Sequence, residues 1–586
     1  MRCASVIATL VVAGASAVSA GVLGRNNMKP PPLLADPDLE WPEVSVPSPP
    51  RNQLRGTTSL WDHSSSSSSS AVPVRGLATF QQQVDHSDPS QGTFSQRYWY
   101  STEYWTGPGA PVVFFTPGES AADLYTGYLT NRTLTGQFAQ ALGAAVVMLE
   151  HRYWGGSSPF ANLTTKNLRF LTLANAVADT TNFARRVQLP FDNLGTGDGS
   201  SSSTTTTTTS NAPDVPWVMS GGSYSGALAA WVQHMDAGTY WAYHASSAVV
   251  QTIGDFWQYF VPVQQGMPQN CSADVQRVVA HVDAVLATGT DADVQALKTA
   301  FGLGSVEHND DFAAALVAGP ASWQDHDFDT DYSTFFQFCD YVENAFPGSN
   351  VTTVPGPDGV GLDKALAGYA KWYTEVAFPG ACASLGYYTD NYTTACFDSY
   401  NASSPYYTDT RVDNTIDRQW EWLLCNEPFE FWQDGAPAGT PTLVSRLVSA
   451  DYAQRQCALY FPPEDGYTYG AAQGRTPADV NAVTGGWSAA AAGNNNTTTR
   501  LVWTNGEFDP WRDATVSSTF RPGGPLASTP AAPVNLIPGG IHCSDLIYAN
   551  ALVNAGVMAV VRDEIAVIKG WVDEFYAAKT PSSSSA

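Results

Sequence analysis

A serine flanked by small residues is the first feature of this sequence that has the chemistry of a nucleophile. Ser223 lies in the run Gly-Gly-Ser-Tyr-Ser-Gly at residues 221–226, after a strand-like segment and before an Ala-rich, helix-like segment at residues 227–235. A serine on a tight strand-to-helix turn projects its hydroxyl over the sheet edge, and the helix N-terminus stabilises an oxyanion there. The run therefore predicts a nucleophile elbow with the Tyr224 N–H as an oxyanion donor. Ser225 replaces the usual last glycine of that motif, and a simple Gly/Ser turn explains the run alone equally well.

An acid and a base follow in the chain order that such a nucleophile needs. Asp509 and then His542 each come shortly after a short apolar run, and His542 is the only one of the nine histidines that follows Asp509. In hydrolases of this type the order is serine, acid, histidine. His542 is predicted to take the proton of Ser223, with Asp509 fixing its tautomer. Glu507 and Asp513 are rival acids.

These three side chains require a mainly parallel sheet that brings distant loops to one edge. Short apolar runs that end at turn residues and alternate with helical patterns are typical of buried parallel strands. The predicted fold class is therefore α/β, as an α/β-hydrolase fold with an inserted, mainly helical cap. The strand-like runs lie at residues 111–116, 144–150, 215–220, 501–504 and 534–538.

Changes in composition along the chain suggest its division into segments. A Met-Arg start, an apolar stretch at residues 4–18 and a small-x-small site before Gly21 are typical of a secretory signal. Ordered structure is expected from near Phe80. The predicted segments are a signal peptide 1–20, a Pro/Ser-rich linker or pro-segment 21–75, a first hydrolase part 76–244, the cap 245–412, a second hydrolase part 413–578 and a polar tail 579–586.

Charge and motif content exclude several classes of partner. The chain has 28 Lys and Arg against 54 Asp and Glu, a net charge of −26, which would repel nucleic acid. No later segment suggests a membrane partner. Neither a CxxC pair nor an HExxH motif occurs, so no metal and no cofactor are predicted. The expected location is extracellular, with a lysosome or vacuole as alternatives.

Cysteines and glycosylation sequons also fit an exported protein. Once Cys3 leaves with the signal, seven cysteines remain, and six of them lie between residues 271 and 457. Disulfides are expected there, with one free thiol and a connectivity that the sequence leaves open. Asn-x-Ser/Thr sequons are predicted glycosylation sites. They are Asn131, Asn162, Asn270, Asn350, Asn391, Asn401, Asn495 and Asn496.

Several motifs together resemble one family, the serine carboxypeptidases that include prolyl carboxypeptidase, dipeptidyl peptidase II and secreted fungal relatives. The resemblance covers roughly residues 76–578 and is weak in the cap. The matching stretches lie at residues 80–86, 94–98, 116–119, 150–155, 168–172, 222–226, 505–511 and 542–546.

The resemblance implies a peptide or protein substrate, cleavage next to proline, and a helical domain inserted after the nucleophile strand. It assigns the triad to Ser223, Asp509 and His542, in agreement with the reading from the residues. The oxyanion hole is expected near Gly118, although the segment there lacks an asparagine common in relatives. Ala227 stands where relatives often have a larger apolar residue, which makes a strict proline preference less secure.

The substrate pocket is less defined by the sequence. A proline-accepting pocket is apolar with aromatic walls, and Trp511 beside the catalytic acid is the best candidate wall, with core packing as the alternative. Glu119 and Glu427 are candidates for binding a substrate amino terminus. Arg152 is a candidate for a C-terminal carboxylate, although a structural ion pair is favoured for it.

Three functional hypotheses stay open at this point. The first is a secreted serine peptidase of the prolyl carboxypeptidase, dipeptidyl peptidase or prolyl endopeptidase type. The second is a carboxylesterase or lipase on the same fold, and the third is a non-catalytic glycosylated binding protein. The oligomeric state is open, with a homodimer as one option.

Overall fold

The computed structural model describes residues 29–44, 72–193, 209–349, 355–489 and 498–579. The predicted signal peptide, the sequons Asn350, Asn495 and Asn496, and nearly all of the polar tail lie outside the described residues.

The fold is organised around an eight-stranded sheet with the strand order β1-β2-β4-β3-β5-β6-β9-β10. The first two strands pair antiparallel, β2 pairs antiparallel with β4, and the other neighbours are parallel. The strands are β1 (Arg75–Gln83), β2 (Thr93–Ser101), β3 (Val112–Phe115), β4 (Ala145–Leu149), β5 (Trp217–Gly222), β6 (Ala242–Ser246), β9 (Leu501–Gly506) and β10 (Val534–Ile537).

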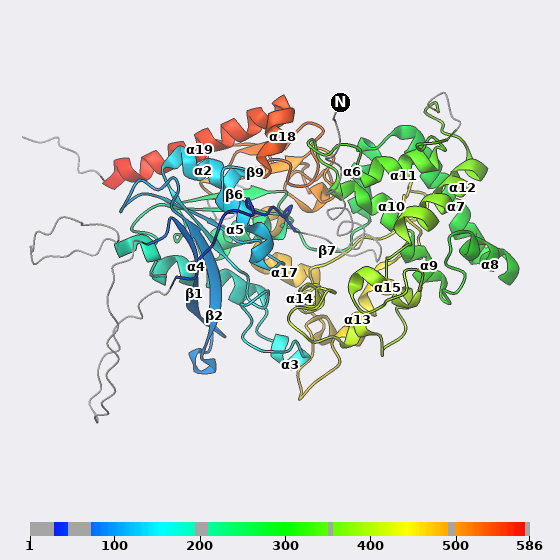
Figure 1. Ribbon diagram of the computed structural model, residues 1–586, viewed down its shortest axis with the longest axis horizontal. Helices are drawn as coiled ribbons and strands as arrows, with labels where there is room; N and C mark the ends of the chain where they lie inside the picture. Colours follow the sequence, from blue (N-terminus) through cyan, green and yellow to red (C-terminus); the bar gives the residue numbers. More distant parts are fainter. Residues whose placement is uncertain (1–28, 45–71, 194–208, 350–354, 490–497, 580–586) are drawn as a thin grey trace, which may run out of the picture.

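Helices cover both faces of this sheet, because the side chains of its central strands alternate between two cores. Val112 and Phe114 of β3 join one hydrophobic cluster, while Val113 and Phe115 join another. One face carries α4 and α5, and the other carries α2 and the long α19 (Figure 1). Their bounds are α2 (Leu134–Leu142), α4 (Leu173–Arg186), α5 (Tyr224–Met235) and α19 (Ala555–Lys579). The α/β-hydrolase fold expected from the sequence is thereby confirmed.

The chain between β6 and β9 forms a mainly helical region beside the sheet (Figure 1). Its only strands among the described residues are β7 (Ile253–Asp255) and β8 (Glu430–Trp432), which pair with each other. Its helices are α6 (Phe260–Gly266), α7 (Gln269–Thr288), α8 (Asp291–Ala300), α9 (Asn309–Ala315), α10 (Ala318–Ala321), α11 (Thr334–Val342), α12 (Leu362–Trp372), α13 (Pro405–Thr408), α14 (Arg418–Asn426), α15 (Ala450–Gln454), α16 (Cys457–Tyr460) and α17 (Pro477–Thr484). Two further helices are α3 (Thr165–Leu168), between β4 and β5 in the chain, and α18 (Tyr548–Val553), between β10 and α19.

Three disulfides lie in this helical region, as expected from the cysteine positions. Cys543 is free and buried, so the predicted single free thiol is confirmed among the described residues. The pairs are Cys271–Cys339, Cys382–Cys396 and Cys425–Cys457. No described helix combines the length and apolar character needed to cross a bilayer.

Residues 29–35, called the strap below, are packed against the sheet loops, although ordered structure was expected only from near Phe80. The hydroxyl of Tyr125 donates to the Pro30 carbonyl at 3.0 Å, and that of Tyr128 donates to the Pro31 carbonyl at 2.8 Å. Both tyrosines belong to the 3-10 segment η2 (Ala122–Leu129). Proline retains its carbonyl as an acceptor, so a Pro-rich composition did not prevent this docking.

Candidate active site

The predicted elbow is a sharp turn between β5 and α5. Ser223 has a left-handed backbone, with φ 59° and ψ −124°, and α5 begins at the next residue. Its N–H donates to the Ser246 carbonyl of the neighbouring strand at 2.9 Å. A non-glycine residue in this conformation carries backbone strain, and such strain gathers at functional sites.

Small residues around the serine are required by close backbone contacts. A Cβ on Gly221 would lie 2.1 Å from the Ser225 carbonyl, and one on Gly226 would lie 2.6 Å from the Ser246 carbonyl. Ser225 fits because its hydroxyl turns back, donating to the Gly222 carbonyl at 2.8 Å and accepting from the Gly222 N–H at 3.0 Å. The departure from the usual glycine is therefore accommodated within the turn.

Asp509 and His542 meet after the last two strands of the sheet. His542 Nδ1 lies 3.0 Å from Asp509 Oδ1, and both side chains are buried. Trp511 N–H also donates to Asp509 Oδ1, at 2.9 Å. The rival acids bind elsewhere: Glu507 accepts from the Gly539 N–H, and Asp513 accepts from the Ser518 hydroxyl.

Backbone contacts bring the histidine loop against the elbow. The Cys543 N–H donates to the Ser247 hydroxyl at 2.9 Å, one residue after the Ser246 carbonyl that binds Ser223. A Cβ on Gly222 would lie 3.0 Å from Cys543 Sγ. Within the described chain, Ser223 Oγ and His542 Nε2 are both buried without a hydrogen-bond partner.

The electrostatic surroundings of His542 favour its charged form. Burial alone lowers the pKa of His542, but Cys543 and Asp509 together raise it well above its usual value. We assign this direction to the Asp509 carboxylate, because burial raises the pKa of the Cys543 thiol and so keeps that thiol neutral. An imidazolium formed during catalysis would thus be stabilised.

Two backbone segments next to Ser223 include the predicted oxyanion donors. Tyr224 is the first residue of α5, so its N–H has no acceptor within the helix. Gly118 has φ 72°, and a Cβ there would lie 3.0 Å from the Tyr224 ring. The Gly118 segment therefore lies directly over the elbow.

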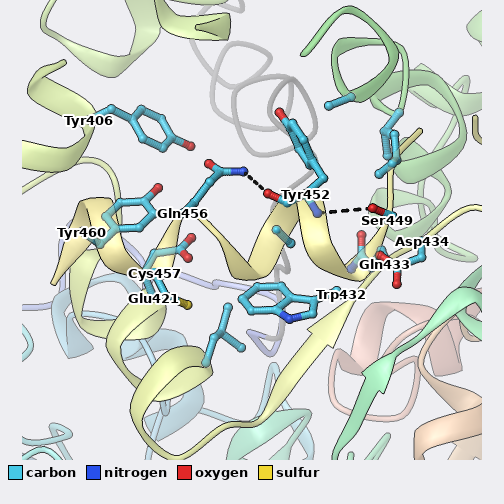
Figure 2. A pocket seen from close by; sticks show the side chains of 15 residues that line it. Tyr406, Glu421, Trp432, Gln433, Asp434, Ser449, Tyr452, Gln456, Cys457 and Tyr460 are labelled. Atoms are coloured by element: carbon cyan, nitrogen blue, oxygen red, sulfur yellow. Dashed lines mark hydrogen bonds between the residues drawn. The ribbon is translucent and has the colours of Figure 1, made fainter. Parts of the chain in front are cut away.

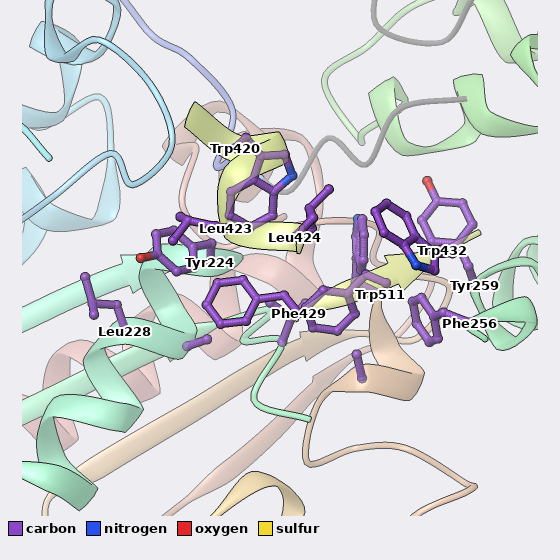
Figure 3. Close-up of a cluster of buried hydrophobic side chains, with 14 of the residues drawn as sticks. Tyr224, Leu228, Phe256, Tyr259, Trp420, Leu423, Leu424, Phe429, Trp432 and Trp511 are labelled. Atoms are coloured by element: carbon purple, nitrogen blue, oxygen red, sulfur yellow. The ribbon is translucent and has the colours of Figure 1, made fainter. Parts of the chain in front are cut away.

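A cluster of buried aromatic side chains includes Tyr224, the residue after Ser223, and Trp511, close to Asp509 in the chain (Figure 3). Trp511 is fully buried; its ring stacks on Phe256 at 5.6 Å between centroids and lies 6.4 Å from the His542 ring. Its indole N–H donates to Gln324 at 2.8 Å. On the other side of the cluster, Trp420 packs edge-on against Tyr224 at 5.3 Å.

The charged residues singled out in the sequence have different surroundings. Glu427 is paired with Arg475 at 3.1 Å. Glu119 is fully buried and neither carboxylate oxygen has a hydrogen-bond partner in the described chain. Burial raises the pKa of Glu119 well above its usual value, against the field of Lys29, which lowers it. Arg152 is buried and binds Asp179 through two 2.6 Å hydrogen bonds, so its structural role is confirmed.

Three participants near the site were missed from the sequence. Asp417 and Lys29 form an ion pair, and both groups influence the pKa of Glu119, while Gln324 accepts a hydrogen bond from the Trp511 indole. They are far apart in sequence and belong to no motif. The only sequence signal was the proline run after Lys29, which was interpreted as part of a linker or pro-segment.

Two other polar features lie away from the proposed triad. A cavity in the helical region is lined by aromatic and acidic side chains, including Trp432, Tyr452 and Asp434 (Figure 2). The ring of His244, a residue of β6, lies 3.1 Å from Asp545 and 3.3 Å from Glu564. This is the one group within the described ranges whose ligand atoms are close enough for a metal ion. A buried histidine between two carboxylates is equally well explained as an ion-pair network.

The described sequons are accessible. Asn270 is half-buried, and the other four are exposed. The exposed ones are Asn131, Asn162, Asn391 and Asn401.

Comparison with known proteins finds one family and several related proteins. The family described as serine carboxypeptidase S28 matches residues 82–565. The serine protease vicPa of Bipolaris victoriae is 41% identical over 509 residues, covering 86% of this chain and 90% of that protein. A protein of Arthroderma benhamiae named as an extracellular serine carboxypeptidase is 28% identical over 506 residues, covering 82% and 64%. The lysosomal Pro-X carboxypeptidase of Pongo abelii is 33% identical over 156 residues, covering 26% and 27%.

Proposed function

The chain belongs to the serine carboxypeptidase S28 family, and on that premise we propose that Ser223, His542 and Asp509 cleave peptide bonds through an acyl-enzyme. The observation that carries the proposal is the buried pair of His542 and Asp509, 3.0 Å apart, beside the strained Ser223 turn. The coarser statement, that the protein is a serine peptidase, follows from the family.

The proposed first step forms an ester on the serine. His542 Nε2 takes the proton of Ser223 Oγ while Oγ attacks the substrate carbonyl carbon. The resulting oxyanion accepts hydrogen bonds from the N–H of Tyr224 and from the Gly118 segment. The C–N bond then breaks, and His542 gives its proton to the departing amine.

The second step returns the free enzyme. His542 takes a proton from a water molecule, whose oxygen attacks the ester carbonyl. The bond to Ser223 Oγ breaks, and the serine recovers its proton from His542. Asp509 holds the imidazole by its Nδ1–H throughout.

We propose cleavage on the carboxyl side of proline. The aromatic rings of Trp511 and Trp420, beside His542 and Tyr224, supply the apolar walls that a pyrrolidine ring needs. The relative from Pongo abelii is named a Pro-X carboxypeptidase. Ala227, where relatives often have a larger apolar residue, is fully buried in the first turn of α5.

We also propose that the protein is exported. The sequons at exposed positions and the three disulfides suit an oxidising compartment. One relative is named extracellular and another lysosomal, and both locations are compatible with these features.

A peptide library tests the substrate proposal. Incubation of the mature protein with synthetic peptides, followed by mass spectrometry, is expected to show cuts after proline. Ser223→Ala under the same conditions controls for contaminating peptidases. Cuts scattered without proline before the cleaved bond would contradict the proline claim, and turnover of esters alone would favour an esterase.

A further inference from the structure

A histidine and two carboxylates converge at a place that the proposed triad does not use. His244 of β6, Asp545 and Glu564 of α19 bring one ligand atom each to within 4.8 Å of one another. The His244 Nε2 atom lies 3.1 Å from Asp545 Oδ2 and 3.3 Å from Glu564 Oε1, and none of the three side chains is more than 1% exposed. The sequence predicted no metal, because these three residues form no spacing motif.

The three side chains lie close together without hydrogen bonding to one another. His244 Nε2, Asp545 Oδ2 and Glu564 Oε2 are buried and have no hydrogen-bond partner in the described chain. A protonated histidine paired directly with a carboxylate would align its N–H with one of the oxygens. Because buried polar atoms are usually satisfied, three such atoms on converging side chains suit a cation that binds all of them.

Each of the three side chains is also held by a hydroxyl group from a strand of the central sheet. Outer contacts of this kind orient the ligands in protein metal sites. The Ser220 hydroxyl lies 3.0 Å from His244 Nδ1. With the proton on Nδ1, the lone pair of Nε2 is free to bind a cation. The two carboxylate contacts are donated by Ser246 to Asp545 and by Thr504 to Glu564.

The charge and the spacing of the group fit a divalent ion. A neutral imidazole and two carboxylates carry two negative charges, which one divalent cation balances, and uncompensated charge is costly to bury. In tetrahedral zinc coordination, with bonds of about 2.0–2.2 Å, ligand atoms lie about 3.3 Å apart. The separations of 3.1 and 3.3 Å from His244 Nε2 are close to that value. A carboxylate binds metals through one or both oxygens, so Glu564 can supply a fourth ligand atom.

We propose that His244, Asp545 and Glu564 bind one Zn²⁺ ion as a structural site. Zinc is favoured over Ca²⁺ and Mg²⁺, because those cations take oxygen ligands while zinc accepts imidazole and carboxylate together. The ligands are closed off from solvent, so the ion would be bound as the chain folds and would not meet the substrate. This inference goes beyond the proposed peptidase function and does not depend on it.

The position of the site gives the ion a role in holding the two catalytic loops together. Asp545 lies three residues after His542 in the histidine loop. Ser246 donates its hydroxyl to Asp545, and its carbonyl accepts from the Ser223 N–H. Glu564 adds the long helix α19 to the same group. An ion bound here would fix the histidine loop to the strand that supports the nucleophile turn.

Metal analysis of the full-length wild-type protein tests the site without any substrate. Protein produced in zinc-containing medium and washed with EDTA under native conditions is expected to retain about one zinc ion per chain by plasma mass spectrometry. X-ray absorption at the zinc edge should show one imidazole and only nitrogen and oxygen ligands, at about 2.0–2.2 Å. Sulfur at about 2.3 Å would instead indicate binding by a cysteine.

Glu564→Gln tests the ligands individually. Glutamine has nearly the same size as glutamate, and its carbonyl oxygen still accepts from the Thr504 hydroxyl, but it removes one charged ligand. Zinc content is expected to fall below about 0.1 per chain, because metal affinity depends on a complete set of deprotonated ligands. His86→Gln is the matched control, since His86 contacts Asp179 at 2.8 Å in a pair outside this group. That variant should retain its zinc.

The results separate the site from its alternative, a proton-bearing histidine between two carboxylates. Folded wild-type protein with less than about 0.1 zinc ion per chain would overturn the metal site. Sulfur ligation, or an unchanged zinc content in folded Glu564→Gln, would overturn it as well. If Glu564→Gln did not fold, the zinc content and absorption spectrum of the wild-type protein would still decide. Because no readout involves cleavage, failure of the peptidase proposal would leave these results standing.

Discussion

The hydroxyl of Ser225 satisfies two backbone groups inside the nucleophile turn, both belonging to Gly222. From the sequence this serine was a departure that weakened the elbow motif. The structure explains why it is tolerated: the close contacts fall on Gly221 and Gly226, while position 225 has room for a small polar side chain. Such a local hydrogen bond cannot be foreseen from residue types alone.

The acid of the triad gives a prediction at the same scale. Asp509→Asn is expected to lower kcat by about 10⁴-fold, because the imidazole would favour the wrong tautomer. Loss of the carboxylate also removes a charge that raises the pKa of His542, so the acid limb of kcat/KM should move to lower pH. Steady-state kinetics across pH would measure both effects.

Asp513→Asn is the matched control for that measurement. Asp513 is buried nearby but binds Ser518 and Thr519 instead of the histidine. It should change kcat by less than about tenfold and leave the acid limb in place. An equal loss in both variants would argue that burial, and not the contact with His542, explains the effect.

At the level of elements, the sequence predicted the strands that precede the site residues. It did not predict which residues of the helical region pack around those site residues. The runs before Ser223 and Asp509 were apolar, short and ended by turn residues, and they are β5 and β9. The helical region contributes Phe256, Gln324 and Trp420 around the triad. These contacts join residues between 187 and 255 positions apart, and no local pattern encodes them.

The turn between β5 and α5 gives the prediction at this scale. Gly226→Ala would place a methyl group 2.6 Å from the Ser246 carbonyl, and relief of that contact should cost about 1–3 kcal/mol. Because Ser246 also holds the Ser223 backbone, activity should fall along with the melting temperature. Differential scanning calorimetry and peptide hydrolysis would be measured together.

Gly570→Ala provides the comparison for that variant. Nothing lies within 4 Å of a Cβ at Gly570 in α19. An alanine in a helix interior should stabilise by up to about 1 kcal/mol without altering activity. If the two variants behaved alike, the packing account of the elbow would be wrong.

For the whole molecule, buried acidic groups predict a dependence of stability on pH. Burial raises the pKa of Asp325 and Glu430 to about 7, of Asp327 to about 6 and of Asp434 to about 9. A carboxyl whose pKa is higher in the folded than in the unfolded protein stabilises the fold below its unfolded pKa, and that contribution is lost as pH rises through the folded pKa. The net charge of −26 acts in the same direction.

The melting temperature should therefore be higher at pH 5 than at pH 8, by at least about 2 °C. The gain should stop near pH 4, because the pKa of Asp409 is lowered to about 2 and its stabilising contribution begins to be lost as the solution becomes more acid. Thermal denaturation at constant ionic strength would measure this. A melting temperature that rose steadily from pH 5 to pH 8 would contradict it.

The docking of the strap could not be predicted from the composition of the chain. Its prolines and its position before a Ser-rich run predicted a linker or pro-segment, and residues 29–35 nevertheless dock beside the nucleophile. The docking depends on two tyrosine hydroxyls and an ion pair supplied by distant elements. The fold class and the proposed triad could be predicted because sequence motifs indicate them. The arrangement of charged side chains around the site could not, because it forms only when distant parts of the chain come together in the fold.

Covalent labelling tests the central claim most directly. A fluorophosphonate probe reacts with a serine only when its hydroxyl is activated by a neighbouring base. After incubation with the full-length protein, peptide mapping by mass spectrometry should find one adduct on Ser223, absent in Ser223→Ala and strongly reduced in His542→Ala. A folded wild-type protein that stays unlabelled, or an adduct on a different serine, would contradict the account.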